Sequence, residues 1–263
     1  MDLVQATILA LIQGITEFLP ISSSGHLVLP SQVLGWPDQG LAFDTAVHLG
    51  SLVAVVTFFF RDLARFINAG YQQLIMQRPS EDGQYAVCLL IASLPILPVG
   101  FVGRYLIEEN FRSIEVIAVT TITFGLALWY ADRLRRANPE HMTARNALLI
   151  GFAQCLALIP GTSRSGVTIT AALMLGFSRS EAARFSFLMA IPTILGAAGL
   201  KLMDLVTDLG DPDWAALALG TAGAAVSAYA CISLLMRWVD QIGYLPFVIY
   251  RLILGVLLIG LVI

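Results

Sequence analysis

Long apolar stretches separated by short polar segments dominate the pattern along this chain. A helix of roughly 20 predominantly apolar residues is long enough to cross a lipid bilayer. By that measure, six stretches predict transmembrane helices: 42–60, 84–103, 114–131, 183–203, 214–236 and 245–263. The pattern therefore predicts an all-α integral membrane protein.

Two further apolar regions are interrupted by polar breaks. Residues 3–19 are followed by a proline and three serines, after which only the short apolar stretch 26–35 precedes a turn. Residues 145–176 repeat this arrangement around a second break. Each region predicts a re-entrant helix–loop–helix hairpin, because non-helical backbone at membrane depth is tolerated only where protein buries it or where it lines a wet cavity.

The two breaks are related to each other at a constant offset of 141 residues, which aligns Gln13 with Gln154. Three more pairs coincide at this offset: Ser22 with Ser163, Ser24 with Ser165, and Gly25 with Gly166. The chain therefore reads as a single membrane domain, 1–263, with repeat halves at about 1–140 and 141–263. Each half holds one hairpin and three crossings. Because three is odd, the halves lie in opposite orientations, and the hairpin tips meet near the middle.

Basic residues in the connecting segments predict the orientation. The segments 61–83, 132–145, 179–184 and 237–244 are rich in arginine, whereas the opposite side has only Arg104, Arg112 and Lys201. The arginine-rich loops are therefore predicted to be cytoplasmic. Both termini and the mouth of the first hairpin then face outward. The polar residues 71–83 are interpreted as a plain connecting loop.

Composition supports the membrane class and excludes others. The chain is 57% hydrophobic and 13% charged, with a net charge of −3, whereas a soluble protein carries about 25% charged residues. No basic patch lies outside the short loops, so a nucleic-acid partner is not expected. The three cysteines are isolated in apolar runs, which indicates neither a disulfide framework nor a zinc site.

The breaks concentrate the polar chemistry of the chain. Ionisable residues at membrane depth mark function by default, and here they are Glu17, His26 and Arg164. Hydroxyl side chains and glycines surround them: Ser22, Ser23, Ser24, Gly25, Ser163, Ser165, Gly166 and Thr168. Each break also opens a new helix, whose first amides favour an anion. Amides, hydroxyls and a guanidinium together are typical of a phosphate site.

The first break adds reactive groups. A serine becomes a useful nucleophile only beside a base, and His26 follows Ser23 by three residues, which allows both side chains to share a helix face. Glu17 could orient His26, act as acid or base, or bind a divalent ion, with Gln13 as a second ligand. The alternatives are structural: serines that cap helices, and a Glu–Arg bridge. The coincidence of a glutamate, a histidine, an arginine and a serine cluster at two matching breaks favours a functional site.

Three more polar residues have less defined roles. Asp44 and His48 form an i,i+4 pair at the start of a crossing, where they line the site or pair with each other. Arg251 lies in the last apolar stretch, behind Tyr250. We interpret the first two as supporting residues and Arg251 as a structural pairing or snorkelling residue.

Two unusual words carry a resemblance to a known family. The first runs from Gln13 through Glu17 into F-L-P-I-S-S-S-G-H, ending at His26, and the second is P-G-T-S-R-S-G-V-T over 160–168. In these residues the chain resembles the undecaprenyl-diphosphate phosphatase (bacitracin-resistance protein) family. The resemblance extends over the chain almost from end to end. Many relatives have glutamate where this chain has Gln13, which weakens a metal site built on two carboxylates.

The resemblance implies hydrolysis of undecaprenyl diphosphate to the monophosphate, which recycles the lipid carrier of cell-wall synthesis. It further implies a divalent cation (Mg²⁺ or Ca²⁺) and a site facing the periplasmic side of the bacterial inner membrane. Ser23 would be the nucleophile, His26 its base, and Glu17 the residue that orients His26 or holds the metal. Arg164 would bind the diphosphate with Ser163, Ser165 and Thr168. A histidine nucleophile and a metal-bound water are the alternatives.

Two other functional classes compete with this interpretation. Inverted repeats with broken helices are typical of secondary transporters, so a transporter or flippase for a phosphorylated polyprenyl lipid is the main alternative. The acid-phosphatase-like lipid phosphatases need a second histidine followed four residues later by aspartate. Here His48 has Leu52 and His141 has Arg145 at that spacing, so the pattern fails. The expected partners are a polyprenyl diphosphate and the membrane. A homodimer is compatible with the sequence, although no residue points to one.

Overall fold

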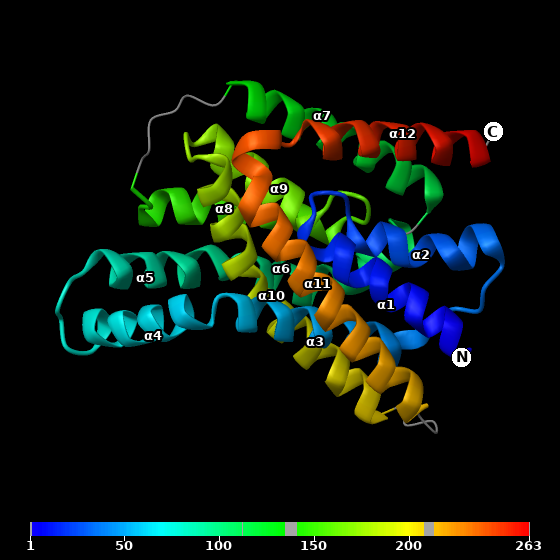
Figure 1. Cartoon of the computed structure of the whole chain (residues 1–263), viewed down its shortest axis with the longest axis horizontal. Coiled ribbons are helices and arrows are strands. Elements are labelled where there is room, and N and C mark those ends of the chain that lie inside the picture. Colours follow the sequence, from blue (N-terminus) through cyan, green and yellow to red (C-terminus); the bar gives the residue numbers. More distant parts are fainter. Residues whose placement is uncertain (1, 112, 135–140, 208–212, 263) are drawn as a thin grey trace.

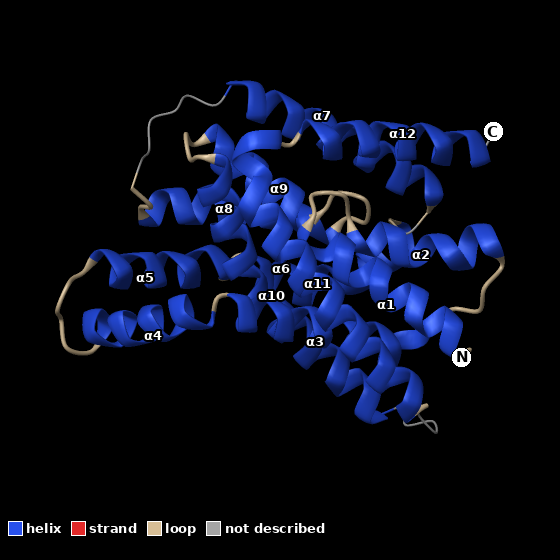
Figure 2. Ribbon diagram, in the orientation of Figure 1, coloured by secondary structure: helices blue, strands red, loops and turns tan. Residues whose placement is uncertain are grey.

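A computed structural model describes residues 2–111, 113–134, 141–207 and 213–262, and the regular structure within them is entirely helical (Figure 2). The first half contains α1 (Leu3–Phe18), α2 (Ser23–Leu34), α3 (Gly40–Phe58), α4 (Phe60–Leu74), α5 (Glu81–Ser93), α6 (Ile96–Asn110) and α7 (Ile114–Leu134). The second half contains α8 (Ala144–Cys155), the short 3₁₀ helix η1 (Leu156–Leu158), α9 (Arg164–Met174), α10 (Arg179–Thr207), α11 (Trp214–Ile242) and α12 (Leu245–Val262).

Both predicted hairpins are present as helix, break and helix. In Figure 1, α1 runs from the N-terminus to the middle of the molecule and α2 returns toward the same end. Helix α8, η1 and α9 form the second hairpin, and the loops of the two breaks lie near the centre (Figure 2). Helices α2 and α9 begin at Ser23 and Arg164, which are equivalent at the 141-residue offset.

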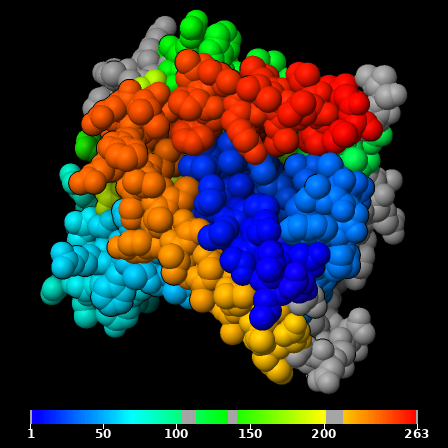
Figure 3. All heavy atoms as spheres, turned by 45° about the vertical axis from the view of Figure 1, so that its right-hand side comes forward, coloured from blue at the N-terminus to red at the C-terminus, as the bar shows by residue number. Residues whose placement is uncertain are grey.

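The packing of the two halves is reciprocal. Helix α1 packs along α11, and its counterpart α8 packs along α5, while α3 contacts α10 and α7 contacts α12. Figure 3 shows α1 between α11 and α2, with α12 across their ends. Small residues permit this approach, because a Cβ on Gly14 of α1 would lie 2.0 Å from Ser227 Oγ of α11. A Cβ on Gly151 of α8 would likewise lie 2.4 Å from the carbonyl oxygen of Ala92 in α5.

Five described segments are long and apolar enough to cross a membrane: Gly40–Phe58, Glu81–Gly103, Ile114–Leu134, Arg179–Leu200 and Trp214–Ile242. They correspond to five of the six predicted crossings and identify a multi-pass helical membrane protein. The sixth predicted crossing is the apolar helix α12, which is shorter in its described part, Leu245–Leu261.

The predicted connection 61–83 is wrong for most of its length. Residues 60–74 form α4, an amphipathic helix that packs on α5 with Phe66 buried. The apolar positions Leu63, Phe66, Ile67 and Gly70 recur at helical spacing, but the polar residues between them obscured that stripe. The predicted crossing 84–103 is also interrupted, because α5 ends just before Pro95, whose ring removes a helical donor. Arg112, Arg135 and Arg136, used for orientation, lie outside the described residues.

Candidate active site

The two breaks share an unusual backbone conformation at equivalent serines. Ser22 has φ 76° and Ser163 has φ 73°, a left-handed region that is costly for residues other than glycine. Each serine hydroxyl lies near the hydroxyl two residues on, at 3.4 Å from Ser24 and 3.2 Å from Ser165. Ser163 also caps α9, where its Oγ accepts a hydrogen bond from the Gly166 amide. Strain held at both tips is typical of a functional constraint.

The tips of the two breaks contact each other. The Ser165 hydroxyl donates to the carbonyl oxygen of Leu19 at 2.9 Å. Arg164 Nη2 lies 3.5 Å from the carbonyl oxygen and from Oε1 of Glu17, 147 positions away in the sequence. The Nη1 group of Arg164 donates to the Ser186 carbonyl oxygen at 2.9 Å. The fold thus brings the acidic residue of one half to the basic residue of the other.

Glu17 is the centre of this cluster and is only 7% exposed. Its Oε2 accepts hydrogen bonds from Ser23 Oγ at 2.7 Å and from Gln13 Nε2 at 3.0 Å. His48 Nε2 lies 3.9 Å from the same oxygen. A buried carboxylate needs such compensation. The Ser23 hydroxyl is therefore already hydrogen-bonded to a group that can take its proton.

The structure does not place His26 as the base of Ser23. His26 Nδ1 lies 2.6 Å from the carbonyl oxygen of Ser22, and Nε2 lies 2.6 Å from the Tyr250 hydroxyl. The His26 and Tyr250 rings also stack, with centroids 5.6 Å apart. Both ring nitrogens are thus engaged elsewhere. His26, on α2, faces Tyr250 of α12. The three-residue spacing from Ser23 does not reveal this tertiary contact.

A cavity of about 180 Å³ joins most of these groups. Six predicted site residues line it: Glu17, Ser22, Ser23, Ser24, Ser163 and Arg164. Its other lining residues include Thr45, His48, Thr193, Ile194, Ala197 and Ala198. One wall is therefore polar and the other is apolar.

Four other predicted residues are buried and do not line the cavity. Thr168 is fully buried, and its hydroxyl lies 2.7 Å from that of Ser186. Gly25, Ser165 and Gly166 are also buried. His48 lines the cavity, and its Nδ1 lies 2.6 Å from the backbone carbonyl oxygen of Asp44. Sequence reasoning missed Thr193, a threonine in α10 that no motif marks.

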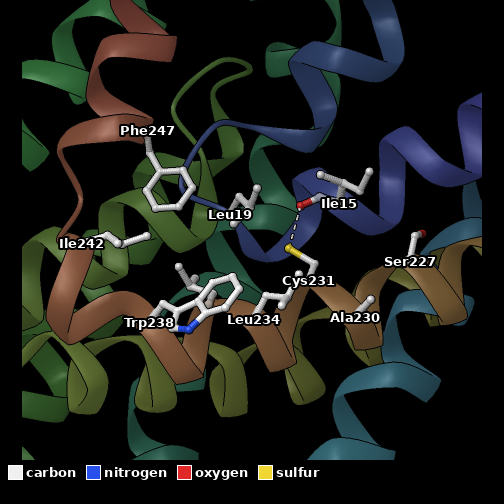
Figure 4. Close-up of a pocket in the computed structure, with 10 residues that line it drawn as sticks. Ile15, Leu19, Ser227, Ala230, Cys231, Leu234, Trp238, Ile242 and Phe247 are labelled. Atoms are coloured by element: carbon white, nitrogen blue, oxygen red, sulfur yellow. Dashed lines mark hydrogen bonds between the residues drawn. The ribbon is translucent and has the colours of Figure 1, made fainter.

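A second, apolar cavity of about 470 Å³ lies between α1, α11 and the start of α12 (Figure 4). Side chains such as Ile15, Trp238 and Phe247 line it, and Leu19 extends it to the first break. Cys231 Sγ donates to the Ile15 carbonyl oxygen at 3.3 Å across its wall. This lining has no charged side chain and is mostly apolar, so it suits hydrocarbon.

Comparison with known proteins places the chain in a family over nearly its whole length. The sequence model of the bacitracin resistance protein BacA family matches residues 6–257. The chain belongs to this family. Three relatives, each called undecaprenyl-diphosphatase, match over 260 residues, which is 98% of this chain and 98% of each relative. They come from Alcanivorax borkumensis (52% identical), Chromohalobacter salexigens (53%) and Teredinibacter turnerae (51%).

Proposed function

We propose that the protein hydrolyses undecaprenyl diphosphate to undecaprenyl phosphate and inorganic phosphate, which recycles the lipid carrier for peptidoglycan synthesis. The observation that carries this proposal is the contact of Glu17 with Ser23 on one side and with Arg164 on the other, at one cavity. Full-length relatives in the BacA family that bear the name undecaprenyl-diphosphatase support the substrate.

The polar wall is suited to the diphosphate. Arg164 lines the cavity, so its guanidinium can donate hydrogen bonds to a phosphate oxygen there. The helix starts at Ser23 and Arg164 add backbone amides. The apolar wall at Ile194 and Ala197 suits the first part of the isoprenoid. The rest of the isoprenoid stays among the membrane-facing helices, because the cavity is far too small for it.

The reaction begins when Ser23 Oγ attacks the terminal phosphorus and its proton passes to Glu17. The bond from that phosphorus to the bridging oxygen breaks, and undecaprenyl phosphate leaves. Arg164 stabilises the charge on the transferred phosphoryl group. Glu17 passes its proton to the departing undecaprenyl phosphate, and a water then attacks the seryl phosphate. Glu17 takes a proton from this water and returns it to Ser23 Oγ, the bond from phosphorus to Oγ breaks, and inorganic phosphate departs.

A divalent cation, Mg²⁺ or Ca²⁺, fits this site only with help from the substrate. The described residues contain no group of three histidine, cysteine, aspartate or glutamate side chains that could hold a metal. Buried Gln13, however, has an Oε1 without a hydrogen-bond partner in the described part of the chain, next to the Glu17 carboxylate. Glu17 and Gln13 would hold the ion, with the diphosphate completing its shell. The ion would supply neutralisation of phosphate charge.

Gln13→Glu tests this assignment. The substitution replaces the donor to Glu17 with a second carboxylate, and two neighbouring carboxylates favour a cation between them. We expect the variant to retain most of its turnover at saturating Mg²⁺ or Ca²⁺ and to lose more than the wild type on chelation. Phosphate release across a cation titration measures both.

The matched control is Gln39→Glu, because Gln39 Nε2 donates to the Asp44 carboxylate at 3.0 Å outside the cavity. Its cation dependence should equal that of the wild type. A collapse of Gln13→Glu activity at saturating cation would show that the cation is held elsewhere.

The proposal includes the membrane arrangement. Six crossings and two re-entrant hairpins in opposite orientations would place the cavity near mid-membrane, open to the periplasmic face of the inner membrane. The α4–α5 connection lies at the left of Figure 1, and both chain ends lie at the right, which supports opposite faces for them. Arg78 in that connection favours the cytoplasm on its side.

Transport of a phosphorylated polyprenyl lipid is the second candidate. The reciprocal packing of the two halves, with their breaks in contact, favours it. A transporter, however, needs no serine held against a carboxylate. The two functions differ in whether the diphosphate bond breaks.

The deciding experiment measures inorganic phosphate and undecaprenyl phosphate formed from undecaprenyl diphosphate by detergent-purified protein, with and without Mg²⁺ or Ca²⁺. We expect equal amounts of both products, and no phosphate when undecaprenyl phosphate is the substrate. Absence of release from folded protein, with both undecaprenyl and farnesyl diphosphate, would overturn the phosphatase. Translocation of the lipid in proteoliposomes would then establish the transporter.

A further inference from the structure

Arg251 is the largest fully buried side chain among the described residues, with an exposed fraction of 0%. A buried cation is normally paired with a carboxylate, because burial of an uncompensated charge is very costly. In the described part of the chain, no aspartate or glutamate forms an ion pair with Arg251. Its charge is met by another kind of partner.

All of its partners are backbone carbonyl oxygens. Nε donates to Thr121 at 3.0 Å, and Nη1 donates to Pro20 at 3.0 Å and to Thr162 at 3.1 Å. Nη2 donates to Gly161 at 2.9 Å and to Thr162 at 3.1 Å, and it lies 3.4 Å from the oxygen of Thr120. Every nitrogen of the guanidinium is thus used.

These carbonyls come from three segments of both halves. Pro20 belongs to the first break, three positions before Ser23. Gly161 and Thr162 belong to the second break, immediately before Ser163 and Arg164. The remaining carbonyls are on α7. A single side chain on α12 therefore holds the backbone on both sides of the Glu17–Arg164 contact.

The breaks require such a donor. Carbonyl oxygens outside a helix lack a partner of their own, and water is scarce at membrane depth. The fold reserves space for the guanidinium, since a Cβ on Gly166 would lie 3.0 Å from Nη1. On the other side, a Cβ on Gly125 of α7 would lie 3.2 Å from the Arg251 Cβ. Arg251 itself does not line the cavity.

We infer that Arg251 is a positioning residue that sets the separation between the nucleophile break and the phosphate-binding break. The inference rests on the proposed phosphatase function for its catalytic part. A planar guanidinium can reach several carbonyls at fixed angles, whereas a lysine ammonium is a point charge on a flexible stem. The shape of the side chain, and not its charge alone, is what the site requires.

The test is chemical rescue. Arg251→Ala and Arg251→Lys are both expected to lower kcat for undecaprenyl diphosphate by about 100-fold, because a shift of about 1 Å in a catalytic group has that effect. KM should change far less. Millimolar guanidinium should restore part of the kcat of Arg251→Ala, while ammonium at the same concentration should not. Arg184→Ala removes an arginine that pairs with Asp62 outside the cavity. This control should keep wild-type kcat with or without guanidinium.

The midpoint of thermal unfolding provides a readout that does not depend on activity. Guanidinium, and not ammonium, should raise the midpoint of Arg251→Ala even if the wild type shows no phosphatase activity, which separates the two proposals. If Arg251→Ala does not fold, Gly125→Ala keeps the charge and displaces the guanidinium, and its kcat should also fall. With an active wild type, unchanged kcat in Arg251→Lys, or a raised midpoint of Arg251→Ala without restored kcat, would overturn the inference; with an inactive wild type, an unchanged midpoint would do so.

Discussion

Replacement of Ser23 by alanine is expected to reduce phosphate release from undecaprenyl diphosphate by on the order of 10³-fold or more, since loss of a nucleophile removes the covalent route. The Ser23 hydroxyl donates to Glu17 at 2.7 Å, so its attack and its deprotonation are coupled in one hydrogen bond. The protein should still fold, because Ser23 lines a cavity and does not fill a core. Steady-state phosphate release and the thermal unfolding midpoint, measured together, provide the comparison.

Ser31→Ala is the matched control for this loss. Ser31 lies on the same helix, α2, and its hydroxyl donates to the Val28 carbonyl oxygen away from the cavity. It should retain wild-type release. Equal release from the Ser23 variant and the wild type would eliminate the serine as nucleophile. A histidine or a metal-bound water would then be the nucleophile.

Glu17→Gln should reduce turnover by about 10²- to 10⁴-fold, the range that a general base contributes. The amide has nearly the same shape and still accepts a hydrogen bond from Ser23, but it cannot take the proton. It also leaves Arg164 without the carboxylate that it faces at 3.5 Å. His26→Asn should have a smaller effect, because His26 contacts Ser22 and Tyr250 instead of the Ser23 hydroxyl.

The order of these two variants decides which residue is the base. Measurements of kcat against pH for Glu17→Gln, His26→Asn and the wild type would establish it. Loss of the acidic limb of the pH profile, where a general base becomes protonated, only in the glutamate variant would agree with the geometry. A deeper loss in His26→Asn than in Glu17→Gln would restore the histidine as the base of Ser23.

The sequence predicted the breaks well because their chemistry is local and is repeated. Pro20 and Pro160 end helices, and the serines and glycines that follow start new ones. The offset between the copies then predicted contact of the tips, which the hydrogen bond from Ser165 to Leu19 confirms. Glu17 and Arg164 were recognised as a set because charged residues are rare at membrane depth.

What the sequence did not reveal depends on distant contacts. The partner of His26 is Tyr250, 224 positions away, so the spacing to Ser23 suggested the wrong neighbour. The six carbonyl contacts of Arg251 could not be foreseen either, because backbone atoms leave no mark in a sequence. Helix α4 was missed since its apolar stripe is short and lies among charges.

Helices α2 and α9 start at equivalent positions, one at Ser23 and the other at Arg164. In the proposed mechanism the same backbone location therefore carries the attacking hydroxyl in one half and the anion-binding guanidinium in the other. The counterpart of Glu17 is Leu158, so the acid also exists in one copy only. Neither copy alone holds a complete reaction centre. Any event that made the two copies alike here, such as gene conversion between them, would remove half of the chemistry. The proposed mechanism thus requires the two halves to differ where their geometry is most alike.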